Sequence, residues 1–177
     1  HFHLSLQSGC DATLHRMNRK YTSEEYAESV ALLRKVFDHP AITTDVIVGF
    51  PGETEEEFTQ TKQFLDRIQF FEMHIFKYSK RAGTRAAVMS HQVPDPVKTT
   101  RSGELLAMEK EQSKRFRAHY LGREAEVLLE EIKELDGVEY LLGHTRDYVK
   151  LAVSVKENKK NVANTVICGR VQGLLTD

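Results

Sequence analysis

The sequence has 177 residues, of which 40% are hydrophobic and 29% charged, and its formal net charge at pH 7 is −1. This composition is typical of a globular protein and provides enough residues for one domain and a small additional module. The sequence has no apolar run of about eighteen residues and no signal-peptide order at its start, which argues against membrane insertion or export and favours a cytoplasmic location.

Strand and helix signals alternate in the first part of the chain, as is typical of βα units that share a parallel sheet. We predict strands over residues 1–6, 41–50 and 71–78, and helices over 11–17 and 23–38. A third helix should follow Thr54, which forms a capping-box pattern with Glu57. The apolar residues of the second helix recur at helical spacing and should face the sheet: Tyr26, Val30, Leu33 and Phe37.

Beyond Tyr78 this alternation stops. Residues 79–90 are predicted to form a loop rich in hydrogen-bond donors, and Asp95 and Pro96 are predicted to open a helix that ends before Gly122 and links two bodies. The remainder contains short strand signals, AEVLLE, YVKLAV and TVICGRV, separated by the turns Asp-Gly, Leu-Gly-His-Thr and Glu-Asn-Lys-Lys-Asn. We therefore predict two domains, residues 1–121 and a small β-barrel over 122–177.

The first residue is not Met, and the strand signal begins without a lead-in, so we expect His1 to be the cut end of a longer protein. His1 and His3 would lie on one face of that strand, but without a third ligand nearby we expect ordinary side chains there rather than a metal site. The two cysteines, Cys10 and Cys168, fit no local metal-binding motif and are expected to be buried free thiols.

Positive charge is concentrated in one segment. Residues 72–121 hold 10 basic and 5 acidic residues, against 7 and 11 before them and 8 and 10 after them. This surplus fits either a solvated helix face or a surface that binds phosphates, and the two interpretations stay open. The candidate cations for a phosphate surface are Lys80, Arg81 and Arg85 in the loop and Lys150, Lys156, Lys159, Lys160 and Arg170 in the barrel.

Two turns at predicted strand ends carry the residues that a ligand site needs. Val48–Thr54 is a glycine-bearing turn between a buried strand and a capped helix, and Ser5–Gly9 offers Gln7 and Ser8 as hydrogen-bonding side chains. Ligands bind at the carboxyl ends of parallel strands, where glycine permits close approach of the backbone. Each turn taken alone is better explained by backbone geometry than by ligand binding.

Four segments, taken together and in order, resemble the tRNA methylthiotransferases of the radical S-adenosylmethionine superfamily. They are HLSLQSGCDATLHRMNRKYT at 3–22, TDVIVGFPGETEEEF at 44–58, FKYSKRAGTRAA at 76–87 and GHTRDYVKLAV at 143–153. The wording LSLQSGC and MNRKYT is most similar to the enzymes that add a methylthio group to threonylcarbamoyladenosine beside the anticodon. The alternatives are the group that acts on isopentenyladenosine and a non-catalytic RNA-binding module.

The resemblance implies an α/β fold: the C-terminal part of a radical SAM TIM-like βα barrel, followed by an all-β TRAM barrel. It implies S-adenosylmethionine and two 4Fe-4S clusters in the full-length enzyme, where one cluster generates a deoxyadenosyl radical and the other carries sulfur. The C-x-x-x-C-x-x-C cluster motif is absent from this sequence, and Cys10 is not a cluster ligand. The chain alone is therefore expected to be inactive, with tRNA and the missing N-terminal half of the protein as its partners.

The resemblance also assigns residues, none of them catalytic and none a metal ligand. Gln7 and Ser8 would contact the ribose or the amino-acid end of S-adenosylmethionine, and Ile47 to Gly49 would pack on its adenine. Glu53 stands one place later than the usual spacing. The remaining cofactor contacts are Gly52 and Tyr78, with backbone groups of 76–78 at the adenine edge, while Arg81, Gly83 and Thr84 would shape the RNA entrance. The RNA contacts are Lys80, Arg81, Arg85 and Lys150.

Overall fold

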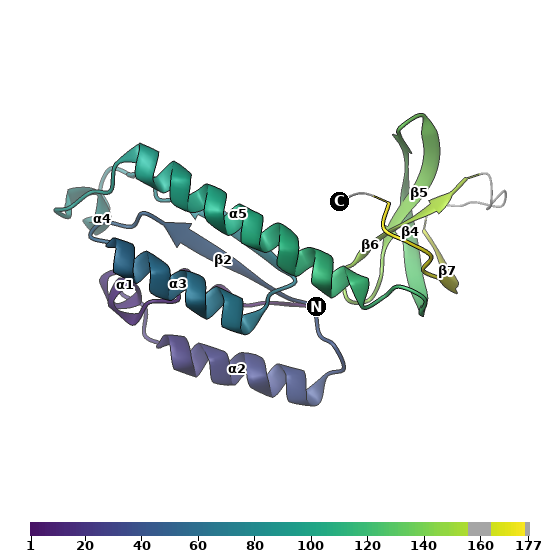
Figure 1. Cartoon of the computed structure of the whole chain (residues 1–177), viewed down its shortest axis with the longest axis horizontal. Helices are drawn as coiled ribbons and strands as arrows, with labels where there is room; N and C mark the ends of the chain where they lie inside the picture. The colour runs from purple at the N-terminus through teal and green to yellow at the C-terminus, as the bar shows by residue number, and fades with distance from the viewer. Residues whose placement is uncertain (156–163, 176–177) are drawn as a thin grey trace. The chain divides into compact units, whose positions relative to one another are not determined.

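Figure 1 shows the computed structural model of the chain, which describes residues 1–155 and 164–175. The chain forms two compact units, one of residues 2–113 and the other of His1 with residues 114 onward. The boundary after Leu121 falls eight residues beyond this division (121 against 113) and stays a prediction.

The first unit is built on a three-stranded parallel sheet. Its strands are β1 (Phe2–His3), β2 (Ile42–Val48) and β3 (Glu72–Lys77), in the order β1-β2-β3. An isolated bridge between Gln7 and Val46 extends the pairing of the first segment beyond β1. The predicted alternation of strands and helices in a parallel sheet is confirmed, although each strand is shorter than the sequence suggested.

Helices connect these strands and cover one face of the sheet: α1 (Asp11–Arg16), α2 (Ser23–Val36) and α3 (Glu55–Ile68). The capping box of Thr54 and Glu57 is present at the start of α3, as predicted, and Thr22 and Glu25 form a second one before α2. Alternate residues of β2 pack with the apolar faces of α2 and α3 in a single core, which includes Ile42, Val46, Val48, Val30, Phe58 and Leu65.

One residue of the predicted apolar face of α2 does not pack against the sheet. Tyr26 and Val30 are buried and Leu33 is partly buried, but Phe37 is 46% exposed. The expectation for Phe37 was wrong because α2 ends at Val36, so the extended backbone of Phe37 leaves the helical phase. Its ring contacts that of Phe2, with centroids 4.8 Å apart.

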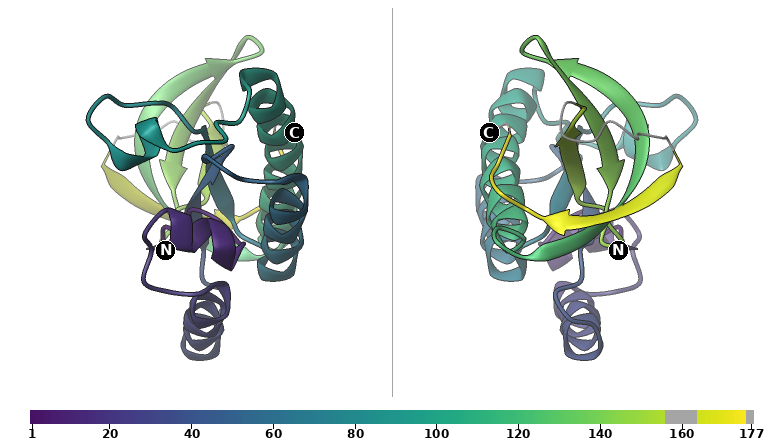
Figure 2. Two further views of the ribbon diagram at one scale, coloured as in Figure 1. Left: turned by 90° about the vertical axis from the view of Figure 1, so that its left-hand side faces the viewer. Right: turned by 90° about the vertical axis from the view of Figure 1, so that its right-hand side faces the viewer.

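Two helices follow β3. Residues 79–90, predicted as a loop throughout, contain the short helix α4 (Arg85–Val88), whose first turn is capped by the Thr84 hydroxyl. The long helix α5 (Asp95–Ala118) begins at Asp95 itself, and its first part runs alongside α3 (Figures 1 and 2). Its buried residues are mostly polar: Lys98, Arg101, Gln112 and Ser113, with Leu105 among them. Among the described residues, no helix is both long and apolar enough to cross a bilayer.

The second unit contains a four-stranded antiparallel sheet in the order β6-β5-β4-β7. Its strands are β4 (Glu124–Leu135), β5 (Val138–His144), β6 (Lys150–Ser154) and β7 (Thr165–Arg170), and β4 is long and bent in Figure 2. Val127, Leu129 and Leu141 form its core. The predicted Asp-Gly turn is confirmed, because Asp136 and Gly137 have φ values of 50° and 76° between β4 and β5.

The predicted Leu-Gly-His-Thr turn is wrong, because Leu142, Gly143 and His144 belong to β5. Gly143 lies beside an irregularity in the register of β4, where a Cβ atom would stand 2.0 Å from the Leu128 carbonyl oxygen. This glycine therefore marks a close backbone approach inside a sheet rather than a turn. The predicted Glu-Asn-Lys-Lys-Asn turn, with Lys156, Lys159 and Lys160, lies outside the described residues.

The two cysteines differ in their surroundings. Cys10 is buried, as expected, whereas Cys168 is exposed on β7. The expectation for Cys168 was wrong because its side chain points to the exposed face of β7, while its neighbour Ile167 packs against the core.

A part-buried ion pair joins α1 to α3. Arg16 binds the Glu57 carboxylate, which also accepts hydrogen bonds from the Thr13 hydroxyl (3.3 Å) and the Thr54 amide (3.1 Å). Burial raises the pKa of Glu57, but the hydrogen bonds from Arg16 and Thr54 outweigh burial and hold this pKa below its usual range. The ionised form of Glu57 therefore stabilises the fold.

Because the folded-state pKa of Glu57 is lowered, its contribution to stability is present above its unfolded pKa of about 4.3 and is lost as pH falls through the folded value. We expect Glu57→Gln to lower the free energy of unfolding at pH 7 and to lower it less below about pH 4. Urea denaturation between pH 7 and pH 3 measures this difference. Glu28→Gln, at an exposed position of α2, is the control. A Glu57→Gln deficit that does not change with pH would contradict the assignment.

Candidate functional site

The carboxyl ends of the three parallel strands bring the two predicted turns together with Tyr78. The backbone amide of Gln7 donates to the Asp45 carbonyl oxygen (2.8 Å), and the backbone amide of Ile47 donates to the Gln7 carbonyl oxygen (2.9 Å). On the other side of β2, the Tyr78 amide donates to the Val48 carbonyl oxygen (2.9 Å). The segments that the sequence singled out at three separate places therefore share one edge of the sheet.

Gln7 has an unusual backbone. It is buried and its φ is 71°, a left-handed conformation that costs a non-glycine residue energy and that often occurs at functional sites. The Tyr21 hydroxyl donates to the carbonyl oxygens of Ser5 (3.0 Å) and Leu6 (2.8 Å), which fixes the chain just before it. In the part of the chain that the structure describes, the Gln7 side-chain amide makes no hydrogen bond with another protein group.

Ser8, by contrast, is engaged within the protein. Its hydroxyl is 3.1 Å from the Thr61 hydroxyl on α3 and accepts a hydrogen bond from the Cys10 amide (3.2 Å). The side chain is almost wholly buried. The structure thus gives this hydroxyl an anchoring role between the first turn and α3, and its contact with a ligand stays a prediction.

Both glycines of the second turn have left-handed backbones, with φ of +72° for Gly49 and +81° for Gly52. A Cβ atom on Gly49 would stand 2.3 Å from Cγ of Lys98, and one on Gly52 would stand 3.2 Å from Nε of Arg16. The requirement for glycine here is therefore explained by the turn itself and by the packing of neighbouring side chains. A contact of either glycine with a cofactor stays a prediction.

Glu53 lies at the centre of a buried ion-pair network. One carboxylate oxygen accepts from the Gly49 amide (2.9 Å) and from the Arg101 guanidinium (2.7 Å), and Arg101 also donates to Glu55 (3.0 Å) and to the Glu53 carbonyl oxygen (3.2 Å). Side-chain exposure is 3% for Glu53 and 6% for Arg101. Burial raises the pKa of Glu53 above its ordinary value, against the opposing effects of the Gly49 amide and Arg101. The carboxylate thus holds the turn and α5 together.

Tyr78 and Ile47 present different surfaces. The Tyr78 ring packs edge-on against Phe50 with centroids 5.3 Å apart, and the Lys98 ammonium lies 5.6 Å from the ring centroid. Its hydroxyl is shielded from solvent and has no hydrogen-bond partner among the described residues. Ile47 is half-buried beside its register partner Phe76, which is 53% exposed, so the two form an apolar surface near the strand ends.

The predicted cations fall into two groups. Lys80, Arg81 and Arg85 are exposed and form no ion pair with any described residue. Lys150, in the second unit, pairs with Glu131 at 3.3 Å.

Two further basic residues, Lys98 and Arg101, are buried and paired with Asp95 and Glu53, so the excess of positive charge in 72–121 overstates its surface charge. Their role could not be predicted, because nothing in the local sequence distinguishes them from solvated helix residues.

Iron-sulfur clusters and S-adenosylmethionine fit this chain differently. A cluster of the radical type needs three thiolates, whereas the sequence contains two cysteines, one buried and one exposed. The residues present therefore do not fit a cluster. The strand ends do fit a polar organic cofactor, because the Gln7 side-chain amide forms no hydrogen bond with a described residue and lies there with the unpartnered Tyr78 hydroxyl and an apolar surface.

Removing one partner of the Glu53–Arg101 pair should leave an uncompensated buried charge. We expect Arg101→Met to lower the free energy of unfolding by about 3 to 5 kcal/mol. Adding Glu53→Gln should restore part of this loss, because the orphaned carboxylate is then removed. Urea denaturation followed by far-ultraviolet circular dichroism measures both variants.

The matched control for that experiment is Arg67→Met, which breaks an exposed pair with Glu24 (3.0 Å; side-chain exposure 53% and 66%). An exposed pair contributes less than about 1 kcal/mol. An equal effect of Arg101→Met and Arg67→Met would show that the buried network does not hold the turn.

Comparison with known proteins places the chain. Residues 1–65 match the model of the radical SAM superfamily. The chain is 42% identical over 159 residues to "Threonylcarbamoyladenosine tRNA methylthiotransferase MtaB" of Bacillus subtilis. The aligned segment covers 89% of this chain and 35% of that protein.

Two further relatives are both named "tRNA-2-methylthio-N(6)-dimethylallyladenosine synthase". The one from Desulfitobacterium hafniense is 40% identical over 148 residues (84% of this chain, 33% of the relative). The one from Thermoanaerobacter sp. is 46% identical over 136 residues (77% and 29%). The chain spans about a third of the length of these curated relatives. Its parallel βα sheet is consistent with part of a TIM-like barrel, and the family match and these relatives together support a radical SAM tRNA methylthiotransferase.

Proposed function

We propose that the chain is part of an enzyme that adds a methylthio group to threonylcarbamoyladenosine beside the anticodon of tRNA. The observation that carries this proposal is the length of the segment that matches MtaB, which is 159 residues. The segments that match the two dimethylallyladenosine synthases are shorter, at 148 and 136 residues. The sequence of the first motif, which runs from His3 to Thr22, supports the same substrate. Such an enzyme would act in the cytoplasm.

In this proposal, the strand ends of the first unit hold S-adenosylmethionine. The side-chain amide of Gln7 and the hydroxyl of Tyr78 offer hydrogen bonds that no described protein group uses, and Ile47 offers an apolar surface for adenine. Glu53 and Ser8 would act indirectly, because their polar atoms are engaged in fixing the two turns. S-adenosylmethionine supplies the methyl group and the radical chemistry when it is bound together with iron-sulfur clusters.

The clusters themselves are not held by this chain in the proposal. Two 4Fe-4S clusters need thiolates in numbers that two cysteines do not provide, so their ligands would lie outside these 177 residues. What this chain contributes is orientation: it fixes the backbone at the strand ends and excludes solvent from the Tyr78 hydroxyl. The chain by itself would have no turnover.

RNA binding is proposed for both units. The antiparallel sheet of the second unit supports a TRAM barrel, whose Lys150 would meet the RNA after leaving its exposed pair with Glu131. In the first unit, Lys80, Arg81 and Arg85 support a contact with the phosphate backbone, because they are exposed and unpaired among the described residues. The partner would be the anticodon stem-loop.

A chimera tests the proposed substrate. The 159 aligned residues of Bacillus subtilis MtaB are replaced by their counterparts from this chain, and the chimera is expressed in cells that lack MtaB. We expect the methylthio derivative of threonylcarbamoyladenosine to reappear in tRNA, because the replaced segment brings its own strand ends to a scaffold that carries the clusters. Mass spectrometry of nucleosides from digested tRNA measures this product.

The matched control is the same replacement in the dimethylallyladenosine synthase of Thermoanaerobacter sp.. Activity of the second chimera alone would contradict the proposed substrate. Absence of activity in both, although both are soluble and bind clusters, would contradict the assignment of this chain to such an enzyme.

The unpaired cations can be tested on the chain itself. A fluorescent anticodon stem-loop is titrated at several salt concentrations, and the variant carries glutamine at Lys80, Arg81 and Arg85. Each phosphate contact contributes about 0.7 to 0.9 to the slope of log K against log salt, so the slope should fall by about 2 to 3.

A variant with the same charge change controls for net charge. It carries glutamine at three exposed residues near α1 and α2: Arg19, Lys20 and Lys35. Equal losses in the two triple variants would contradict a contact at the loop, and salt-independent binding by the unmodified chain would contradict a phosphate contact altogether.

A further inference from the structure

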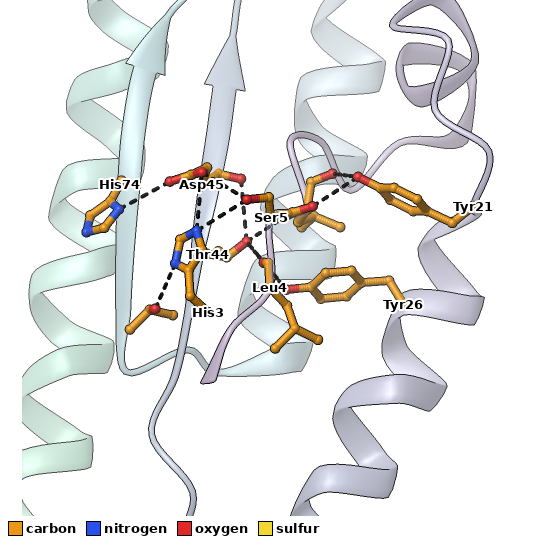
Figure 3. A network of polar contacts seen from close by, with 10 residues as sticks. His3, Leu4, Ser5, Tyr21, Tyr26, Thr44, Asp45 and His74 are labelled. Carbon is orange, nitrogen blue, oxygen red and sulfur yellow. Dashed lines mark hydrogen bonds and ion pairs between the residues drawn. The ribbon is translucent and has the colours of Figure 1, made fainter. Parts of the chain in front are cut away.

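Three potential metal ligands lie together on the face of the parallel sheet that is not packed against the helices. They are His3 of β1, Asp45 of β2 and His74 of β3 (Figure 3). Asp45 and His74 are register partners, and His3 pairs with Thr43, two residues before Asp45. Because side chains alternate along a strand, this register places all three on one face, opposite Ile42 and Val46 in the core.

The distances within this cluster are short. His3 Nε2 is 3.3 Å from one Asp45 carboxylate oxygen, and His74 Nδ1 is 3.2 Å from the other. The candidate ligand atoms all lie within 4.8 Å of one another. Ligands of a tetrahedral Zn²⁺ ion are roughly 3.3 to 3.5 Å apart, given bonds of about 2.0 to 2.2 Å. Each histidine meets this requirement with a different Asp45 oxygen. A site that uses one oxygen therefore needs ligand atoms that lie up to 4.8 Å apart to approach by about 1.4 Å.

A second layer of hydrogen bonds orients these ligands. His3 Nδ1 lies 3.0 Å from the buried Thr43 hydroxyl, and an Nδ1–H group that donates there leaves the lone pair of Nε2 facing Asp45. The Ser5 hydroxyl donates to the Asp45 carboxylate at 3.0 Å. Metal-binding histidines are commonly oriented by such second partners.

We propose that His3, Asp45 and His74 form a site for a divalent transition-metal ion of the zinc type, with at least one position left for water or another ligand. Two imidazole nitrogens and one carboxylate oxygen are a common donor set for zinc and for non-haem iron. The side chains are 38%, 26% and 55% exposed in the order given, so an ion has access to them. The sequence pattern of His1 and His3 did not reveal this site, because the partners of His3 come from β2 and β3.

The site is tested on the metal-free chain by calorimetric titration with Zn²⁺ and by the visible absorption of bound Co²⁺. We expect one ion per chain. Loss of an outer hydrogen-bond partner typically weakens metal binding by about 10- to 100-fold, so Thr43→Val should weaken it by about 10-fold. Asp45→Asn and His74→Gln, which remove ligands, should each weaken it by more than about 100-fold. Zn²⁺ should raise the Tm of the unmodified chain and leave that of the two ligand variants unchanged.

His15→Gln, at an exposed position on α1, is the matched control and should bind Zn²⁺ as the unmodified chain does. A chelate formed by the terminal amine and His3 needs neither Asp45 nor His74, so unchanged binding in both ligand variants would overturn the proposal. No binding by the unmodified chain, with its circular dichroism intact, would also overturn it and leave the cluster as a hydrogen-bonded trio. His74 is more than half exposed, so His74→Gln should fold normally.

Discussion

The buried pair of Glu53 and Arg101 is the contact on which the strand-end site depends. It ties the turn after β2 to α5, while the Gly49 amide donates to the same carboxylate. Near the other end of α3, Gln112 of α5 accepts from the Phe70 amide (2.9 Å) and donates to the Leu65 carbonyl oxygen (3.0 Å). Polar side chains of one helix thus fix both ends of α3. A buried charge pair adds little net stability over an apolar contact, but it specifies one arrangement wherever an unpaired charge would be costly.

Some polar residues at the strand ends are used to hold the turns in place, and others are left without a protein partner. The polar atoms of Ser8 and Glu53 are already satisfied by Thr61, Cys10, Gly49 and Arg101, so a ligand would have to displace protein groups to reach them. The side-chain amide of Gln7 and the hydroxyl of Tyr78 have no such partners among the described residues, and leaving a buried hydroxyl unsatisfied costs free energy. The Tyr78 hydroxyl is itself shielded from solvent, so a ligand would reach it only after neighbouring groups move.

Much of the fold was predictable from the sequence because local signals and tertiary structure agree. The capping box at Thr54 and the apolar periodicity around Val30 give the same helices that the structure shows. Predictions failed where a distant contact decides the outcome. Gly143 lies inside a strand, where the nearby Leu128 carbonyl leaves no room for a Cβ atom. The buried face of α5 is polar because its hydrogen-bond partners lie at the two ends of α3. Periodicity cannot register a buried arginine whose partner is 48 residues away.

The cluster of His3, Asp45 and His74 follows from the same alternation that builds the core. Packing Ile42 and Val46 against the helices turns Asp45 to the other face of β2, the face that lines the interior of a TIM-type barrel. Ile47 lies on this face as well, closer to the carboxyl end of the strand. Three residues of strand span about 10 Å, so a ligand at the end of β2 would lie about that far from Asp45. The polar cluster and Ile47 therefore lie on the same face of the sheet, and a charge held by the cluster would act on whatever binds at the strand ends.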